Sequence, residues 1–146
     1  MINIDHLNEQ NHEIAELTKV LSYMINDREI CDTDILNKLF FSYIEKVSDH
    51  LRIEEKNLYQ PLMIHSENKV RQTANRFLSG SSEIKRVFKQ YQKRWCRHGK
   101  LYIRNHEKFL KDSDDMFEMV FDRIVDEAER LYPVVREVMD ELEEVA

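Results

Sequence analysis

Residues 50 to 61 read His-Leu-Arg-Ile-Glu-Glu-Lys-Asn-Leu-Tyr-Gln-Pro, and residues 123 to 133 read Arg-Ile-Val-Asp-Glu-Ala-Glu-Arg-Leu-Tyr-Pro. The second stretch repeats the order of the first, with Arg123 at the position of His50. Residues four apart lie on the same face of an α-helix, so each copy places a basic residue and a glutamate on one inward face. The repeated phrase therefore predicts two helices that direct such a pair inward, and the pair is either half of a metal site or the remnant of one.

Length and composition indicate a single domain over residues 1–146. The chain of 146 residues contains two Gly and two Pro and is 34% charged, which is typical of a nearly all-helical protein. The net charge of −6 argues against a general nucleic-acid surface, which would need clustered Lys and Arg. One basic stretch, residues 85–100, is interpreted as the solvated face of a helix, so we expect no nucleic-acid partner.

The sequence also predicts where the protein works. The first residues show no basic region followed by an apolar run, and no stretch approaches about 18 apolar residues. We therefore expect a cytoplasmic protein of bacterial type that has no membrane partner. Cys31 and Cys96 lack the spacing of a metal site, and we assign them no chemistry.

Apolar residues recur at helical spacing in four segments. The segments are expected over residues 3–26, from Thr33 to about Pro61, from Ser66 to about Arg97, and from Ser113 or Asp114 onward. A short extra helix capped by Asn105 is expected before the fourth. The short connections favour an all-α, antiparallel up-down-up-down four-helix bundle.

The fourth segment should continue as a C-terminal helical extension. Pro133 removes a backbone donor and should kink or end the helix. Beyond it an amphipathic pattern continues through Val135, Val138, Leu142 and Val145. We expect this tail to pack on the bundle or on a partner, either another protein or a second copy of the chain.

Each predicted helix also carries polar residues inside its apolar stripe, about midway along its length. These residues are Asn11, then His50 with Glu54, then Ser81, and then Arg123 with Glu127. In an antiparallel bundle they converge on one layer and should form a core polar network. Gly80, beside Ser81, is expected to bend its helix or to let a neighbour approach closely.

At this point the sequence resembles the hemerythrin-like, cation-binding HHE family. The resemblance rests on Leu7-x-x-x-Asn11-x-x-Ile14, on His50-x-x-x-Glu54-Glu55-x-x-Leu58-Tyr59 and on Glu127-x-x-x-Leu131-Tyr132-Pro133. It implies a four-helix bundle that holds two irons and binds or senses dioxygen. The implied ligands are a His from the first helix, a His and Glu four apart from the second, a His from the third, and a His and acidic residue four apart from the fourth.

Only part of that ligand set is present. His50, Glu54 and Glu127 match family ligands, whereas Asn11, Ser81 and Arg123 stand at or near histidine positions. A guanidinium is always cationic and has no lone pair for a metal, but it can replace the charge of a metal. We expect Arg123 to pair with both glutamates and to replace the di-iron centre, so that no cofactor is bound.

Two alternatives remain open. His50, Glu54 and Glu127 can instead hold a single Fe or Zn ion with water completing the shell. Alternatively, both glutamates are solvated at the edge of the seam, the inward-facing stripe where the helices meet, and His50 is an ordinary core histidine.

No nucleophile–base pair or phosphate-binding loop is visible, so an enzyme is not expected and no catalytic residue is assigned. The sequence favours a metal-free regulatory or protein-interaction module. The alternative is a mononuclear Fe- or Zn-binding protein in redox or oxygen sensing or in iron handling. A residual metal-dependent redox activity ranks last.

Overall fold

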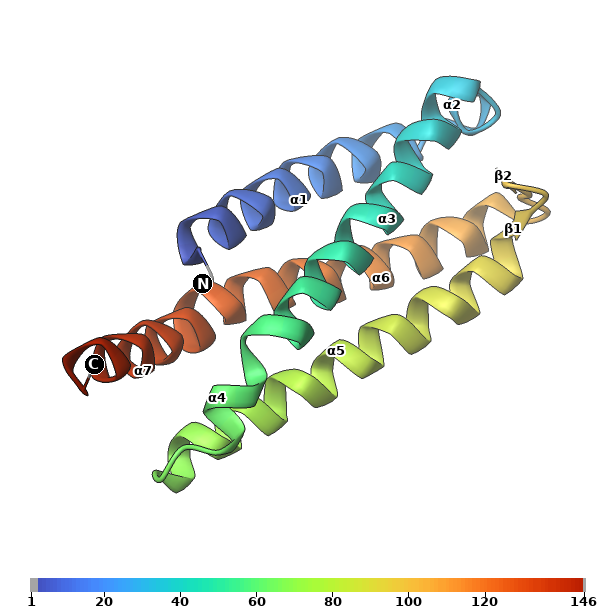
Figure 1. Cartoon of the computed structure of the whole chain (residues 1–146). Coiled ribbons are helices and arrows are strands. Elements are labelled where there is room, and N and C mark those ends of the chain that lie inside the picture. Colours follow the sequence, from blue (N-terminus) through green and yellow to red (C-terminus); the bar gives the residue numbers. More distant parts are fainter. Residues whose placement is uncertain (1–2, 146) are drawn as a thin grey trace.

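The structure, a computed structural model, describes residues 3–145 of the chain; residues 1, 2 and 146 of the predicted domain and the side chain of Val145 lie outside this description. Four long helices run side by side along the molecule (Figure 1). They are α1 (Ile4–Met24), α3 (Asp34–Asn57), α5 (Asn68–Trp95) and α6 (His106–Asp126). α1 packs on α3 and α6, and α5 packs on α3 and α6, as in the predicted four-helix bundle.

The helices begin where side chains can satisfy their first backbone donors. Asn3 accepts from the backbone N–H of His6 at the start of α1, and Thr33 accepts from Leu36 at the start of α3. The predicted cap at Ser66 is wrong: Glu67 is the residue before α5, and its side chain makes no capping bond.

The connections are short and locally ordered. The single-turn helix α2 (Arg28–Cys31) links α1 to α3, and α4 (Tyr59–Met63) follows α3 after an interruption at Leu58. Between α5 and α6, the strands β1 (Cys96–Arg97) and β2 (Lys100–Leu101) form a small antiparallel hairpin. Its turn residues have positive φ angles, 53° at His98 and 73° at Gly99, as two-residue hairpin turns of this kind require.

The prediction of a separate short helix before the fourth is wrong. Asn105 does act as a cap, accepting from the backbone N–H of Lys108, but the helix that it starts continues without a break to Asp126. Ser113, expected near the next helix start, is buried inside α6 and bonded to the hydroxyl of Tyr91 at 2.6 Å. Its hydroxyl therefore has a tertiary partner and does not cap a helix.

The predicted C-terminal extension is present as α7 (Tyr132–Val145), which follows the π-helical turn η1 (Glu127–Leu131). Pro133 lies in the first turn of α7. In a regular α-helix a proline ring crowds the backbone carbonyl four residues earlier, and here that position lies in the wider π turn. Val135 and Val138 are buried, whereas Leu142 is 53% exposed. The inner face of the tail therefore packs on its own bundle.

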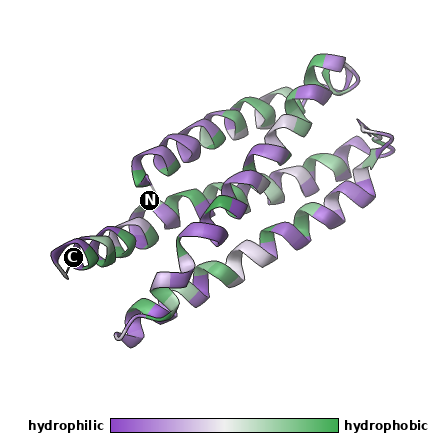
Figure 2. Cartoon of the chain, viewed as in Figure 1, coloured by the Kyte–Doolittle hydropathy of each residue, from purple (hydrophilic) through white to green (hydrophobic). Residues whose placement is uncertain are grey.

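The core consists of two apolar clusters, and apolar and polar residues alternate around each helix (Figure 2). The hairpin-end cluster lies toward β1 and β2 and includes Leu21, Phe40, Tyr43, Phe88, Trp95 and Phe109. The tail-end cluster lies toward α4 and α7 and includes Leu7, Leu58, Leu62, Ala74, Leu131 and Val135. Along all four long helices, the predicted polar positions fall between the two clusters. None of the helices within residues 3–145 combines the length and apolar character needed to span a membrane.

Candidate metal centre

The six predicted polar residues meet in one layer at the middle of the bundle. Five are buried, with 0 to 3% of their surface exposed, and the Arg123 side chain is 9% exposed. Glu54 and Glu127 are both fully buried, so the alternative of two solvated glutamates is wrong. The five buried residues are Asn11, His50, Glu54, Ser81 and Glu127.

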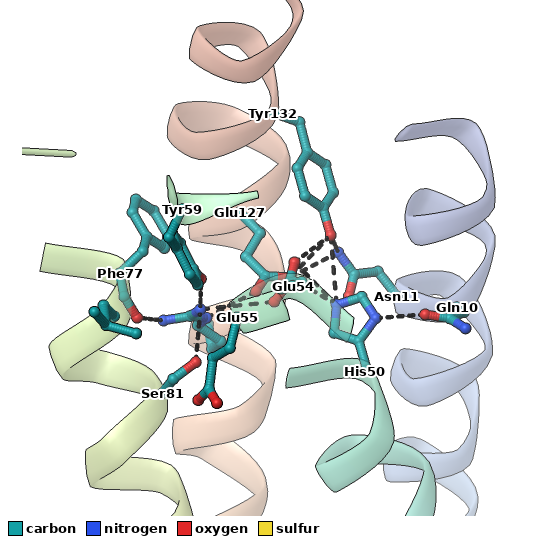
Figure 3. A network of polar contacts seen from close by, with 12 residues as sticks. Gln10, Asn11, His50, Glu54, Glu55, Tyr59, Phe77, Ser81, Glu127 and Tyr132 are labelled. Atoms are coloured by element: carbon teal, nitrogen blue, oxygen red, sulfur yellow. Dashed lines mark hydrogen bonds and ion pairs between the residues drawn. The ribbon is translucent and has the colours of Figure 1, made fainter. Parts of the chain in front are cut away.

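The layer has two halves on either side of the carboxylates of Glu54 and Glu127 (Figure 3). We call one the imidazole half; it contains Gln10, Asn11, His50 and Tyr132. We call the other the guanidinium half; it contains Tyr59, Phe77, Gly80, Ser81 and Arg123.

In the imidazole half, both ring nitrogens of His50 have partners. Nδ1 lies 2.8 Å from Oε1 of Gln10, and Nε2 lies 3.0 Å from Oε1 of Glu127. The amide nitrogen of Asn11 donates to the same Glu127 oxygen at 3.1 Å. Because Gln10 accepts through its carbonyl oxygen, Nδ1 carries a proton and Nε2 is the nitrogen that faces the carboxylates.

In the guanidinium half, Arg123 has a partner for each of its nitrogens. Nε donates to Oε2 of Glu127 at 2.8 Å, Nη1 to the carbonyl of Phe77 at 2.7 Å, and Nη2 to the hydroxyl of Tyr59 at 2.7 Å. Nη2 also lies 3.3 Å from Oγ of Ser81, and the guanidinium carbon lies 4.9 Å from the centre of the Phe77 ring. This cation is therefore fixed by the surrounding helices.

The two carboxylates bridge the halves. Glu127 directs Oε2 to Arg123 and Oε1 to His50. Glu54 does the same at longer range, with Oε1 3.7 Å from Nη2 of Arg123 and Oε2 3.3 Å from Nε2 of His50. Each glutamate thus has room for a positive charge on both sides. The guanidinium of Arg123 occupies one of these two positions, and the other lies beside Nε2 of His50.

Gly80 makes room for that guanidinium. A β-carbon at position 80 would lie only 2.8 Å from Nη1 of Arg123. The expectation of a close approach at this glycine is confirmed, and the group that approaches is the guanidinium of Arg123.

The environment shifts the pKa values of the charged groups apart. Burial raises the pKa of Glu54 to about 8, with the neighbouring Glu127 acting in the same direction. Burial also acts to raise the pKa of Glu127, but hydrogen bonding with Glu54 and His50 and the charge of Arg123 hold it well below its usual range. Burial acts to lower the pKa of His50, yet the two carboxylates outweigh it and raise the pKa to about 9. The layer therefore retains a proton at His50 unless another cation takes its place.

Two tyrosines and one glutamine belong to the polar layer although the sequence did not single them out as members. Tyr132 donates to Oε2 of Glu54 at 2.8 Å, and Tyr59 accepts from Arg123. The repeated phrase contains the signal that could have found the tyrosines, since each lies five residues after its glutamate. Gln10, which holds His50, gives no such signal, because it lies outside the apolar stripe.

Five residues would not align two side chains on a regular α-helix, and both helices are irregular at this point. In the second copy the π turn η1 separates Glu127 from Tyr132, whose backbone N–H bonds back to the carbonyl of Glu127. In the first copy α3 ends before Leu58 and α4 starts at Tyr59. Each interruption lies between a glutamate and the tyrosine that joins it in the layer, and the second is a π turn, a feature that is frequent at functional sites.

Two metal ions do not fit this layer. The guanidinium half offers a hydroxyl and a guanidinium where the resemblance implies imidazoles, and Arg123 already supplies a positive charge there. A single ion does fit the imidazole half, where His50, Glu54 and Glu127 each present a ligand atom within 4.8 Å of the others. Oε1 of Glu54, which faces Nη2 of Arg123 at 3.7 Å on the other side of the layer, is buried and has no hydrogen-bond partner among the described residues.

Other features of the sequence lie outside the centre. His12 is exposed on the outer side of α1. The basic stretch on α5 is an exposed face with several ion pairs, among them Lys85 with Glu55 and Arg94 with Asp112.

In a comparison with protein families, residues 3–135 match the Hemerythrin HHE cation binding domain. The matched range contains all six residues of the predicted network together with Tyr59 and Tyr132. No curated protein and no solved structure matches the chain with significance.

Proposed function

This chain belongs to the hemerythrin HHE cation-binding family, and we propose that it binds a single metal ion, with the guanidinium of Arg123 in place of a second one. The bridging position of Glu54 and Glu127 carries this proposal. Each carboxylate faces a fixed cation on one side and the Nε2 atom of His50 on the other. One cationic position is thus filled by the chain itself, and the other is open to a proton or a metal ion.

The orientation of His50 supports a cation at that second position. Gln10 fixes the proton of the neutral ring on Nδ1, so Nε2 would point a lone pair at Oε1 of Glu127, only 3.0 Å away. Two acceptors at this distance repel each other unless a positive charge lies between them. A metal ion with an imidazole nitrogen and two carboxylate oxygens satisfies this requirement, and such a donor set suits iron or zinc.

The residues around the ligands would orient them. Gln10 holds the ring of His50, and Asn11 holds Glu127, so two of the three ligands have a partner that sets their direction. An iron ion held there would supply a one-electron redox couple, which supports redox or oxygen sensing or iron handling as the class of function. The di-iron chemistry of the family is not proposed for this chain, because Asn11, Ser81 and Arg123 provide no imidazole.

Metal analysis of freshly purified protein tests the proposal. We expect one equivalent of Fe or Zn per chain, and we expect the His50→Ala variant to lose it. His12→Ala is the matched control, because His12 is exposed and should leave the metal content unchanged. Protein that is free of metal and does not take up a single equivalent would overturn the proposal, as would two equivalents of iron.

A metal-free regulatory or protein-interaction module is the second candidate function. Its support is that the layer has cationic partners of its own, since a protonated His50 and Arg123 lie on either side of Glu54 and Glu127 without a metal ion. In this case the protein would act through a partner or through a homodimer. The C-terminal tail offers the exposed Leu142 for such a contact. The neighbouring Glu141 is hydrogen-bonded to His65 at 2.8 Å, and Ile64, next to His65 in the sequence, is 80% exposed.

Sedimentation of the metal-free protein tests this second candidate. A dimer that dissociates in the Leu142→Glu variant would support it. The second candidate would be contradicted if the protein is a monomer and if a pull-down from its native cell also recovers no stoichiometric partner.

A further inference from the structure

We propose that Tyr132 is a fourth ligand of the single ion, so that the centre is a phenolate site with one nitrogen and three oxygen donors. The inference rests on the proposed single-ion function and adds a donor that is not among the three acidic and histidine ligands described above. Tyr132 is the first residue of α7 and is 2% exposed, and its side chain points into the layer (Figure 3).

The position of the hydroxyl carries the inference. The oxygen of Tyr132 lies 2.8 Å from Oε2 of Glu54, 3.1 Å from Oε1 of Glu127 and 3.4 Å from Nε2 of His50. Nε2 of His50 in turn lies 3.0 and 3.3 Å from those two carboxylate oxygens. Four of these five separations lie in the range expected of ligands around one ion, since metal bonds of about 2.1 Å place neighbouring donors roughly 3.0 to 3.4 Å apart, and the contact of Tyr132 with Glu54 is slightly shorter.

Asn11 has a role in this arrangement. Its amide nitrogen donates to the hydroxyl oxygen of Tyr132 at 3.0 Å and to Glu127 at 3.1 Å. A donor aimed at the phenol oxygen stabilises negative charge on that oxygen. Asn11 is therefore a positioning residue that supports two ligands, although it stands where the family has a ligand of its own.

The backbone supplies an independent argument. On a regular α-helix, Tyr132 would point well away from Glu127, and the π turn η1 brings the two onto one face. Pro133 accounts for an irregular helix near this point, but it does not require the hydroxyl of Tyr132 to lie among three ligand atoms.

Ligation would exchange one bond for another. The O–H bond of Tyr132 breaks, the proton leaves to solvent, and the oxygen bonds to the ion with no change in oxidation state. A set of three oxygens and one nitrogen without sulfur is a hard donor set, and tyrosine serves as an iron ligand elsewhere in protein chemistry. Ferric iron is therefore the ion that this centre should prefer.

Tyr59 provides a matched control within the same chain. It occupies the corresponding position of the repeated phrase, is 2% exposed and also contacts the layer. Its hydroxyl, however, accepts from Nη2 of Arg123 at 2.7 Å and thus lies in the guanidinium half. Each copy of the phrase places a tyrosine beside one cationic position, and only the second faces the ion.

The test is ferric iron added as its nitrilotriacetate complex to metal-free protein, followed by visible absorption, resonance Raman spectra and iron content after gel filtration. We expect wild-type protein and Tyr59→Phe to show a phenolate-to-iron charge-transfer band with enhanced phenolate vibrations. Tyr132→Phe should lose the band and bind iron at least about tenfold more weakly. Circular dichroism establishes that each variant is folded.

The outcomes separate the two proposals. Wild-type protein that binds one iron sensitive to His50→Ala but shows no band overturns the role of Tyr132 and leaves the single-ion function standing. A band that survives in Tyr132→Phe has the same meaning. If Tyr132→Phe does not fold, the spectra decide: a band in wild type that persists in Tyr59→Phe supports Tyr132, and a band lost in Tyr59→Phe overturns it. Wild-type protein that binds one zinc but no iron overturns the phenolate site and leaves the single-ion function standing, and protein that binds neither metal overturns both.

Discussion

The guanidinium of Arg123 lies against the backbone of Gly80, so that a β-carbon at position 80 would be 2.8 Å from Nη1. That nitrogen cannot withdraw freely, because it donates to the carbonyl of Phe77 at 2.7 Å. The missing side chain at position 80 is therefore what admits a cation to this half of the layer.

The contact between Gly80 and Arg123 predicts a dependence between two substitutions. Alanine is favoured over glycine in mid-helix by about 1 kcal/mol, so Gly80→Ala should stabilise an Arg123→Ala protein by that amount. In the wild-type background the same change should lower the free energy of unfolding, because the methyl group displaces the guanidinium. Urea denaturation of the wild type, the two single variants and the double variant measures the coupling between the substitutions. Additive effects on the free energy of unfolding would contradict the contact.

Removal of the guanidinium should be costly. Arg123→Ala leaves Glu127 and Glu54 buried without their cation, and we expect the free energy of unfolding to fall by about 3 to 5 kcal/mol. Arg76→Ala is the control, because Arg76 is 55% exposed and pairs with Asp126 at the surface. The control should change the free energy by no more than about 1 kcal/mol. Equal effects of the two substitutions would mean that Arg123 is solvated.

The pKa shifts predict how the stability of the metal-free protein depends on pH. Folding raises the pKa of His50 from 6.5 to about 9 and that of Glu54 from 4.5 to about 8. Both groups therefore bind more protons in the folded chain, and stability must fall as pH rises. The contribution of His50 is complete below pH 6.5 and is lost as the pH rises through 9, and that of Glu54 is complete below pH 4.5 and is lost through 8.

Urea denaturation at pH 6 and pH 8.5 checks this expectation. The free energy of unfolding should decrease between them by a few kcal/mol, on the order of the 1.4 kcal/mol that each pKa unit represents. His50→Gln should flatten the decrease. Glu127 has the opposite sign, since its pKa is lowered, and its contribution is lost on acidification. A stability that rises between pH 6 and pH 8.5 would show that the pair does not retain its protons.

The tail should stabilise the bundle through its inner face alone. Val138 is 4% exposed within the tail-end cluster, so Val138→Ala should lower the free energy of unfolding by about 2 kcal/mol. Leu142→Ala, at a position 53% exposed, should change the stability of the monomer by less than about 0.5 kcal/mol. Thermal unfolding of the two variants distinguishes them, and a neutral Val138→Ala would mean that α7 is not docked.

Periodicity predicted most of the fold because apolar residues at helical spacing determine which face of a helix is buried. The stripe of α3, with its steps of four and three, placed His50 and Glu54 inward, and both are buried. Helix ends were harder to predict, because several residues compete to cap them. Serine is a residue type that often caps a helix start, yet Ser113 lies inside α6, where its hydroxyl is hydrogen-bonded to Tyr91.

The candidate site could be predicted only where regular helices supply it. Asn11, Ser81 and Arg123 follow the seam and were identified. Tyr132 depends on a π turn, and a π turn changes the direction of every side chain after it. Gln10 reaches His50 from beside the seam, through a long side chain whose direction no periodic pattern specifies.

The polar layer between the two apolar clusters has a consequence for how the helices are aligned along their axes. Apolar surfaces alone tolerate a shift of one helix by a turn, since leucines and phenylalanines can exchange neighbours. The layer does not, because such a shift would separate Glu127 from Arg123 or His50 and leave a buried charge without a partner. Whatever cation completes the imidazole half, the chain's own ionic contacts at this level select a single alignment of the four helices.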